Sequence, residues 1–422
     1  MSATGHHALT AGRERATLLT LAAVQFTHIL DFMIMMPLGA QLMQVFNITP
    51  AQFTHLVAAY GVAAAISGMA GGFVLDRFDR KRALVILYAG FGIATLACAM
   101  APNHTALLIA RLAAGAFGGL AGSLVNAMVG DVIPMARRGR AMSIVMTAFP
   151  MASVLGVPLG LYVAARYNWH APFFLLAACA AGVLVLAMFA LPPIRTAVQG
   201  HEPLRQMREI LSHGIHLRAF AVGTFLVMAG GTLIPFIAPS FIANLGLDPE
   251  VGLPITYMVG GVATAMTTPF IGWLSDRMDR LKLLAVMSGA AIVVVLIITR
   301  LGVTSVALAS VMMALFMVTM SGRFSPAMTM ITNAVEARYR GGFMSVNAAL
   351  QQAASAGASV LAGQFITRAP DGRLAGMPML GYVSIVFFVL TVVLAARLRS
   401  VAPHVSAPPF KTPLAATSEA AA

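Results

Sequence analysis

The chain has 422 residues, of which 59% are hydrophobic and only 10% are charged, and its mean hydropathy is +0.86. A soluble domain carries about 25% charged residues because its surface must be hydrated, so this composition excludes a soluble protein and predicts a surface that mostly faces lipid. The formal charge of +13 would suggest nucleic acid as the partner of a soluble domain, but membrane proteins concentrate Lys and Arg in cytoplasmic loops, and we expect no nucleic-acid partner.

Twelve apolar stretches recur along the chain, each long enough to cross a bilayer as a helix. The first six are residues 17–43, 53–75, 83–101, 105–129, 141–165 and 172–191. The other six are residues 219–242, 253–275, 283–301, 305–334, 342–366 and 377–396. We therefore predict an all-α membrane protein with twelve transmembrane helices in two six-helix halves, residues 17–191 and 219–396, joined by a polar cytoplasmic linker at 192–218.

The basic residues predict which ends of these helices face the cytoplasm. If the tails 1–16 and 397–422 lie inside, 21 of the 27 Lys and Arg residues fall in cytoplasmic segments. The outer segments then contain four: Arg166, Arg300, Arg368 and Arg373. This asymmetry predicts a multi-pass protein of the inner (plasma) membrane with both termini in the cytoplasm. Its proline-containing C-terminal tail is predicted to be disordered.

Asp31 is the acidic residue of the first stretch, in the segment HILDFMIMMPLGAQL, residues 28–42. His28 precedes it by three residues and Gln25 lies one turn further away, so a helix places the three side chains on one face. An ionised carboxylate is unfavourable in lipid, and we expect this face to line the bundle interior or a water-filled cavity. The alternative is a structural carboxylate paired with His28 or Arg111.

An eleven-residue segment occurs twice: GFVLDRFDRKR, residues 72–82, and GWLSDRMDRLK, residues 272–282, with five identical positions. Two copies of one helical unit are typical of transporters whose binding site lies between the copies. The repeat contains the residues that we expect to close the cytoplasmic side as a latch: Gly72, Asp76, Arg77 and Arg80, and in the second copy Asp276, Arg277 and Arg280.

This repeated segment resembles the signature of the major facilitator superfamily, Gly-x-x-x-Asp-Arg-x-Gly-Arg-Lys-x, and the resemblance covers nearly the whole chain. Asp79 and Asp279 stand where that signature usually has glycine. The resemblance implies alternating access, with Asp76 pairing with basic groups and helix ends when the inner side is closed. The alternative is ordinary cytoplasmic charge with two acidic residues among it.

The fourth stretch contains Arg111, followed by Gly115 and Gly119 at a spacing that allows close helix packing. A buried arginine costs about 2.5–3.5 kcal/mol on insertion scales, although its side chain could instead extend to the outer interface. The segment resembles the Arg-x-x-x-Gly motif of proton-coupled antiporters, and Asp31 resembles the acid that drug and sugar exporters carry on their first span. These resemblances imply that Asp31, Arg111 and His28 couple proton transfer to transport.

The fifth stretch contains VLGVPLGLYVA, residues 154–164, with Gly156, Pro158 and Gly160. It partly resembles the antiporter motif Gly-Pro-x-x-Gly-Gly and is more similar to the arabinose-efflux-permease and sugar-efflux branch. The alternative is a simple proline kink.

The candidate residues of the substrate cavity are Gln25, Asn126, Arg323, Asn347 and Gln351. Arg323, beside a predicted helix interruption, could bind an anionic substrate group or could pair with Asp31 across the halves. Asn347 and Gln351 recur at one helical face, which either lines the cavity or hydrogen-bonds to a neighbouring helix.

The two cysteines lie in apolar stretches, and we expect neither a metal nor a cofactor. No GxxxxGK[ST] loop for ATP is present, and no catalytic constellation suggests an enzyme. We predict a monomeric secondary transporter whose partners are the bilayer, protons and a small-molecule substrate, most simply a proton-coupled exporter of a drug-like compound or sugar. The alternatives are a proton-coupled importer of a sugar or organic acid and a membrane sensor that does not transport.

Overall fold

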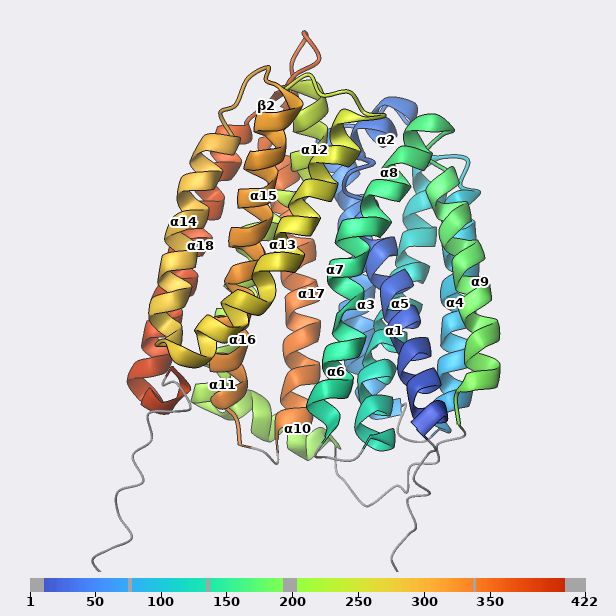
Figure 1. Cartoon of the computed structure of the whole chain (residues 1–422), viewed down its shortest axis with the longest axis vertical. Coiled ribbons are helices and arrows are strands. Elements are labelled where there is room, and N and C mark those ends of the chain that lie inside the picture. Colours follow the sequence, from blue (N-terminus) through green and yellow to red (C-terminus); the bar gives the residue numbers. More distant parts are fainter. Residues whose placement is uncertain (1–10, 75–77, 134–136, 193–202, 337–338, 407–422) are drawn as a thin grey trace, which may run out of the picture.

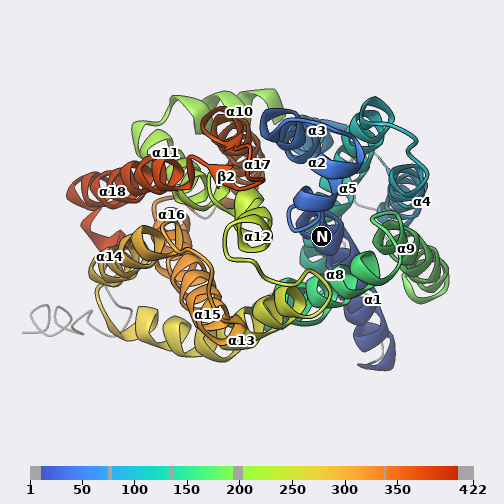
Figure 2. The same ribbon diagram turned by 90° about the horizontal axis from the view of Figure 1, so that it is seen from above.

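The structure is a computed structural model that describes residues 11–74, 78–133, 137–192, 203–336 and 339–406. Long helices run side by side in one bundle (Figure 1). Seen from above, α1–α9 gather on one side and α10–α18 on the other (Figure 2). We call these sets the N-terminal group and the C-terminal group, and their equivalence to two six-helix halves stays a prediction.

The helices of the N-terminal group are α1 (Ala11–Ile34), α2 (Gly39–Val45), α3 (Pro50–Val74), α4 (Arg80–Ala99), α5 (His104–Val132), α6 (Arg138–Met146), α7 (Ala148–Met151), the π-helix η3 (Ala152–Gly156), α8 (Val157–Arg166) and α9 (Ala171–Ala190). Those of the C-terminal group are α10 (Pro203–Ser212), α11 (Gly214–Gly231), α12 (Ile234–Ala243), α13 (Gly252–Arg277), α14 (Arg280–Ile298), α15 (Val306–Gly322), α16 (Phe324–Asn333), α17 (Arg340–Phe365), α18 (Met377–Val401) and the 3₁₀ turn η4 (Pro403–Val405). The strands β1 (Thr367–Arg368) and β2 (Leu374–Ala375) form an antiparallel hairpin.

Ten helical segments of the described chain are long and apolar enough to cross a membrane. The predicted spans 253–275 and 342–366 coincide with α13 and α17, which are 26 residues long but are not among those ten. The structure therefore confirms a nearly all-helical protein with many apolar spans, and the count of twelve stays a prediction. The predicted linker is partly helical, because α10 lies within it.

Several predicted spans are interrupted, and proline explains three of the interruptions. The helices α6, α11 and α15 end four residues before Pro150, Pro235 and Pro326. Proline has no N–H to donate to the carbonyl four residues earlier, so the helical ladder loses a bond at that point. The π-helix η3 likewise contains Val154, the residue to which Pro158 cannot donate.

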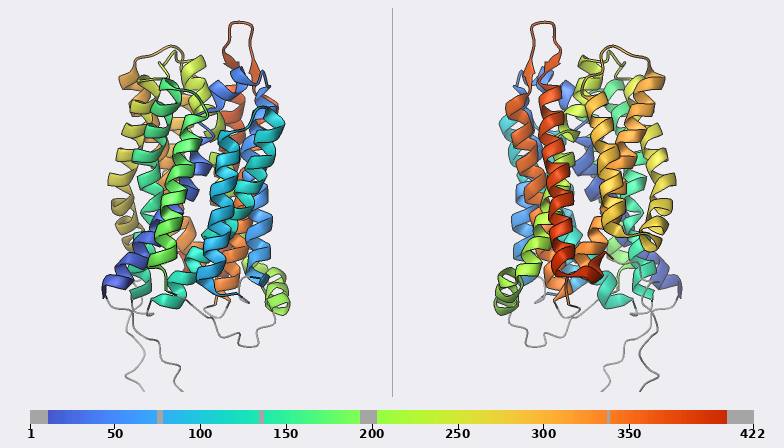
Figure 3. Two further views of the ribbon diagram at one scale, coloured as in Figure 1. Left: turned by 90° about the vertical axis from the view of Figure 1, so that its right-hand side faces the viewer. Right: turned by 90° about the vertical axis from the view of Figure 1, so that its left-hand side faces the viewer.

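The two ends of the bundle differ in how the groups pack. We call the end with α2, α12 and the β1–β2 hairpin the hairpin end, and the end with α10 the linker end (Figures 1 and 3). At the hairpin end one hydrophobic core contains residues of both groups, with the rings of Phe53 and Phe236 6.2 Å apart. At the linker end each group has its own hydrophobic core. The residues of one core come from the sequence range 18–191, and those of the other come from the range 210–405.

Glycines bring the two groups into backbone contact along two seams. A Cβ on Gly61 of α3 would lie 3.0 Å from the carbonyl oxygen of Gln352 in α17. A Cβ on Gly261 of α13 would lie 2.9 Å from the carbonyl oxygen of Ser153 in η3. These seams and the shared core join the groups at the hairpin end, whereas at the linker end the hydrophobic residues of the two groups form separate cores.

Candidate functional site

The site centres on a buried ion pair between α1 and α5. Nη1 of Arg111 donates to Oδ2 of Asp31 over 2.6 Å, and both side chains are 0% exposed. The same nitrogen donates to the backbone oxygen of Asp31 at 3.3 Å, and Thr95 Oγ1 of α4 donates to Oδ1 at 3.4 Å. Of the two alternatives for Arg111, the structure therefore has the buried one, and Asp31 pairs with Arg111 and not with His28.

Tyr60 of α3 covers the other side of the guanidinium. The Cζ atom of Arg111 lies 4.5 Å from the centre of the Tyr60 ring, which is close enough for a cation–π contact. The nitrogens Nε and Nη2 of Arg111 have no hydrogen-bond partner among the described residues. Sequence reasoning did not identify Tyr60 or Thr95, because nothing in the stretches around them shows which side faces Arg111.

Glycines of α5 allow the neighbouring helices to reach this site. A Cβ on Gly119 would lie 2.7 Å from the Cα of Ala64 in α3, and one on Gly118 would lie 2.7 Å from Cδ2 of His28 in α1. The predicted close packing along this helix is therefore present in the structure.

His28 and Gln25 share one face of α1, as the spacing predicts. Gly122 of α5 faces both side chains: a Cβ on Gly122 would lie 3.6 Å from His28 Cε1 and 3.7 Å from Gln25 Oε1. Both ring nitrogens of His28 and Oε1 of Gln25 are buried without a hydrogen-bond partner in the described chain. The candidate Asn126 also lies on α5, but its side chain is exposed.

The predicted kink of the fifth span packs directly against the helix that carries Asp31. A Cβ on Gly156 would lie 2.7 Å from Leu30 Cδ1, and one on Gly160 would lie 2.5 Å from Ile34 Cδ1. Leu30 and Ile34 flank Asp31 on α1. The two glycines around Pro158 therefore set how closely η3 and α8 approach the site.

Arg323 lies in the C-terminal group, at the break between α15 and α16, and is 1% exposed. Its Cζ atom lies 4.3 Å from the ring centre of Phe388 in α18, and Nη2 lies 3.1 Å from the sulfur of Met320. It does not pair with Asp31, whose carboxylate is bound by Arg111. The cross-half pair considered for these two residues is therefore absent from this conformation.

Asn347 and Gln351 on α17 face other helices of the C-terminal group. A Cβ on Gly223 of α11 would lie 2.8 Å from Asn347 Oδ1 and 3.3 Å from Gln351 Nε2. Gln351 Nε2 also lies 3.6 Å from the sulfur of Met328 in α16. Gln351 thus hydrogen-bonds to a neighbouring helix, whereas Asn347 Oδ1 is buried without a hydrogen-bond partner in the described chain. The place of both amides in the substrate cavity stays a prediction.

The expected latch is only partly within the described residues. Asp76 and Arg77 lie outside them, and Gly72 lies near the end of α3. Arg80 is buried, with Nε 3.1 Å from Oδ2 of Asp131 in α5.

The second copy of the repeat is described in full. Asp276 and Arg277 are exposed at the end of α13, with the Arg277 guanidinium 4.3 Å from the Trp273 ring centre, and Arg280 is buried at the start of α14. The closing function of both copies stays a prediction.

Asp79 and Asp279, the departures from the usual glycine, have the same role in both copies. Each is the N-cap of the following helix: Asp79 accepts a hydrogen bond from the backbone of Arg82, and Asp279 accepts one from that of Lys282. Asp279 also forms an ion pair of 3.2 Å with Arg399. At this position aspartate therefore begins a helix and satisfies one of its free N–H groups.

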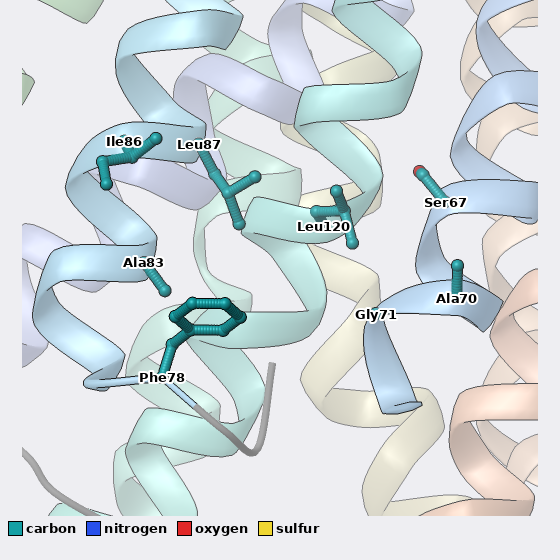
Figure 4. Close-up of a pocket in the computed structure, with 8 residues that line it drawn as sticks. All are labelled: Ser67, Ala70, Gly71, Phe78, Ala83, Ile86, Leu87 and Leu120. Atoms are coloured by element: carbon teal, nitrogen blue, oxygen red, sulfur yellow. The ribbon is translucent and has the colours of Figure 1, made fainter. Parts of the chain in front are cut away.

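A separate apolar pocket of about 370 Å³ lies between α3, α4 and α5 (Figure 4). Its lining residues are Ser67, Ala70, Gly71, Phe78, Ala83, Ile86, Leu87 and Leu120. None of them is charged or belongs to the polar group around Asp31.

Residues 21–359 match the protein family described as Major Facilitator Superfamily. The chain belongs to this superfamily. Its fold agrees: a bacterial homologue of the human lysosomal transporter Spinster, solved in an inward-facing and unoccupied conformation, has a TM-score of 0.74 at 16% identity, covering 95% of this chain and 100% of that one. The D-xylose–proton symporter has a TM-score of 0.71 at 16% identity, covering 92% and 97%.

Curated relatives are named as transporters. The gallate transporter of Pseudomonas putida is 24% identical over 296 residues, which are 61% of this chain and 64% of that protein. The vacuolar membrane amino acid uptake transporter fnx2 of Schizosaccharomyces pombe is 28% identical over 177 residues, 39% of this chain and 30% of that protein. The chain thus spans less than two thirds of these relatives, and its membership of the efflux branch stays a prediction.

Proposed function

We propose that this major facilitator protein is a proton-coupled secondary transporter that exports a small organic molecule by alternating access. The observation that supports the proposal most is the ion pair of Asp31 and Arg111, both fully buried. Two charges can be buried together only while they compensate each other. Protonation of Asp31 would remove one charge and weaken the contact, so the pair has two states that differ by one proton.

Alternating access requires that one end of the bundle is closed while the other is open. The shared core at the hairpin end and the separate cores at the linker end are the arrangement expected for one such state. With the predicted topology, the linker end faces the cytoplasm. We infer that the structure corresponds to an inward-facing state in which Asp31 has already released its proton to the cytoplasm and pairs with Arg111, and which substrate would enter from that side.

A second candidate is the proton-coupled uptake of an organic acid. It is favoured by Arg323, a buried cation in the interior of the predicted span 305–334, and by the relative named as a gallate transporter.

The test uses purified protein in proteoliposomes with gallate and a panel of drug-like compounds and sugars. We expect a proton gradient, acidic on the hairpin side, to drive substrate toward that side. Asp31→Asn is expected to lose gradient-driven transport but to retain substrate exchange without a gradient, because only the proton-dependent step is removed. Asp371→Asn, which changes an exposed carboxylate in the hairpin loop, is the matched control.

The outcomes separate the candidates. Gradient-driven movement in the opposite direction would replace the exporter by the importer. Wild-type gradient-driven rates in Asp31→Asn would remove Asp31 from the coupling site.

A further inference from the structure

Five charged side chains of the described chain are buried: Asp31, Arg80, Arg111, Arg280 and Arg323. Arg80 and Arg280 occupy equivalent positions in the two copies of the repeat, at the first residues of α4 and α14. Asp31 and Arg111 compensate each other. Arg323 is therefore the buried cation in the interior of a span for which the described residues provide no carboxylate.

The surroundings of Arg323 compensate its charge poorly. The guanidinium contacts a phenylalanine ring and a thioether sulfur, and its nitrogens Nε and Nη1 have no hydrogen-bond partner among the described residues. Contacts of this kind are weak compared with the cost of removing a guanidinium from water. A buried arginine is usually retained where an anion is bound, because its planar N–H groups match the two oxygens of a carboxylate.

The backbone around Arg323 favours local movement. The residue separates α15 from α16, and Pro326 cannot donate to the carbonyl of Gly322. The next side chain, Phe324, is 38% exposed. Successive helical residues are about 100° apart, so a rotation of that order at this break would turn the guanidinium from the covered surface of the helix toward the exposed one.

We propose that Arg323 binds the carboxylate of the transported substrate, which makes the substrate a small organic anion with an apolar or aromatic body. The Phe388 ring and the Met320 sulfur provide the apolar contact beside the guanidinium. This proposal rests on the proposed transport function. It also balances the charges of the spans: Asp31 and Arg111 cancel, Arg323 leaves one positive charge, and the carboxylate neutralises it.

Binding is measured without transport, as the thermal stabilisation of the purified full-length protein. The probes are benzoate, hexanoate and succinate, each with its uncharged amide, at constant ionic strength. We expect at least one carboxylate, but not its amide, to raise the unfolding temperature of the wild type. Arg323→Gln should weaken this binding about tenfold or more, and Arg323→Lys should weaken it less because the charge remains.

The matched control is Arg300→Gln. Arg300 also stacks on an aromatic ring of α18, at 5.1 Å from the centre of Tyr382, but it is exposed at a helix end. This variant should bind the carboxylate as the wild type does.

A second variant separates anion binding from a structural role. Without any ligand, Arg323→Met should unfold at a higher temperature than the wild type, because an uncompensated charge is removed. If Arg323 instead stabilises the fold, Arg323→Met should unfold at a lower temperature than the wild type.

The proposal is overturned if no carboxylate stabilises the wild type more than its amide does, or if Arg323→Gln binds equally well. Asp31→Asn should still bind the anion, since Arg323 is unchanged. If the wild type binds no carboxylate but still shows gradient-driven transport, the proposed substrate class is rejected and the proton-coupling proposal stands. If the wild type binds the carboxylate but shows no gradient-driven transport, only the proton-coupling proposal is rejected.

Discussion

Substituting either Asp31 or Arg111 alone should lower the free energy of unfolding of the protein. Substituting both residues together should restore much of that free energy. Both side chains are 0% exposed and the charged atoms are 2.6 Å apart. Removing one partner of a buried pair costs about 3–5 kcal/mol, because the remaining charge is left uncompensated. In Asp31→Asn the Tyr60 ring still contacts the guanidinium, but the wild type has the same contact, so it does not reduce the loss.

We therefore expect Asp31→Asn to lower the free energy of unfolding by about 3–5 kcal/mol. Arg111→Gln should cost about 3–5 kcal/mol, since the carboxylate of Asp31 then keeps, among the described side chains, only its hydrogen bond from the hydroxyl of Thr95. The double variant contains no buried charge at this site and should cost less than either single one. The exposed pair of Asp371 and Arg373 should show almost no such coupling.

The native cysteines provide the assay. Cys98 is fully buried, whereas Cys179 is exposed. In a Cys179→Ser background, a thiol-reactive dye that fluoresces on reaction reports unfolding through Cys98 alone. If the two single variants unfold at the temperature of the parent, or if the effects of the two substitutions simply add, the ion pair does not stabilise the fold and its proposed two-state character has no energetic basis.

Three further outcomes test the seams, the caps and the aromatic contact. Gly363→Leu should open the hairpin end, because a Cβ there collides with Thr54; spin labels on α2 and α12 would report a longer distance. Asp279→Ala should cost about 0.5–2 kcal/mol as a lost N-cap, and Asp279→Asn should cost less because asparagine also caps; thermal unfolding measures both. Tyr60→Leu should lower the unfolding temperature more than Tyr60→Phe does, because only phenylalanine retains the ring against Arg111.

The spans could be predicted from composition because lipid requires long apolar helices whatever the tertiary packing. The interruptions depend on a local property of proline, which the sequence also contains. Arg323 was expected beside a helix interruption, and the structure has one there. The breaks before Pro150 and Pro235 follow from the same missing hydrogen bond four residues earlier, but the apolar pattern runs through them unchanged.

The partners of the charged residues could not be predicted, because they depend on how each helix is rotated about its axis. The spacing placed Gln25 and His28 on one face of α1, and the structure agrees. Spacing does not say whether Asp31 meets Arg111 or Arg323, since both are arginines within spans. The decision depends on the glycines of α5, which allow α1 and α3 to approach Arg111 until its guanidinium fits between Asp31 and Tyr60.

The departures from the family signature show how local chemistry can replace a usual glycine. Asp79 and Asp279 have φ of −61° and ψ of 123° and 119°, which is an ordinary extended conformation. No left-handed backbone is required there, so glycine is not needed. An aspartate at this position instead caps α4 or α14, and the two helices begin with the same backbone geometry at the cap.

The packing around Asp31 connects its charge to the contact between the two groups. Its neighbours Leu30 and Ile34 rest on Gly156 and Gly160, at the end of η3 and within α8. The other side of η3 touches Gly261 of α13 in the C-terminal group. A displacement of α1 on protonation of Asp31 would thus reach the opposite group through direct contacts. A π-helix is a single irregular turn within an α-helical span and often occurs at functional sites, so η3 is the segment of this route where we expect the winding to change as the groups rock.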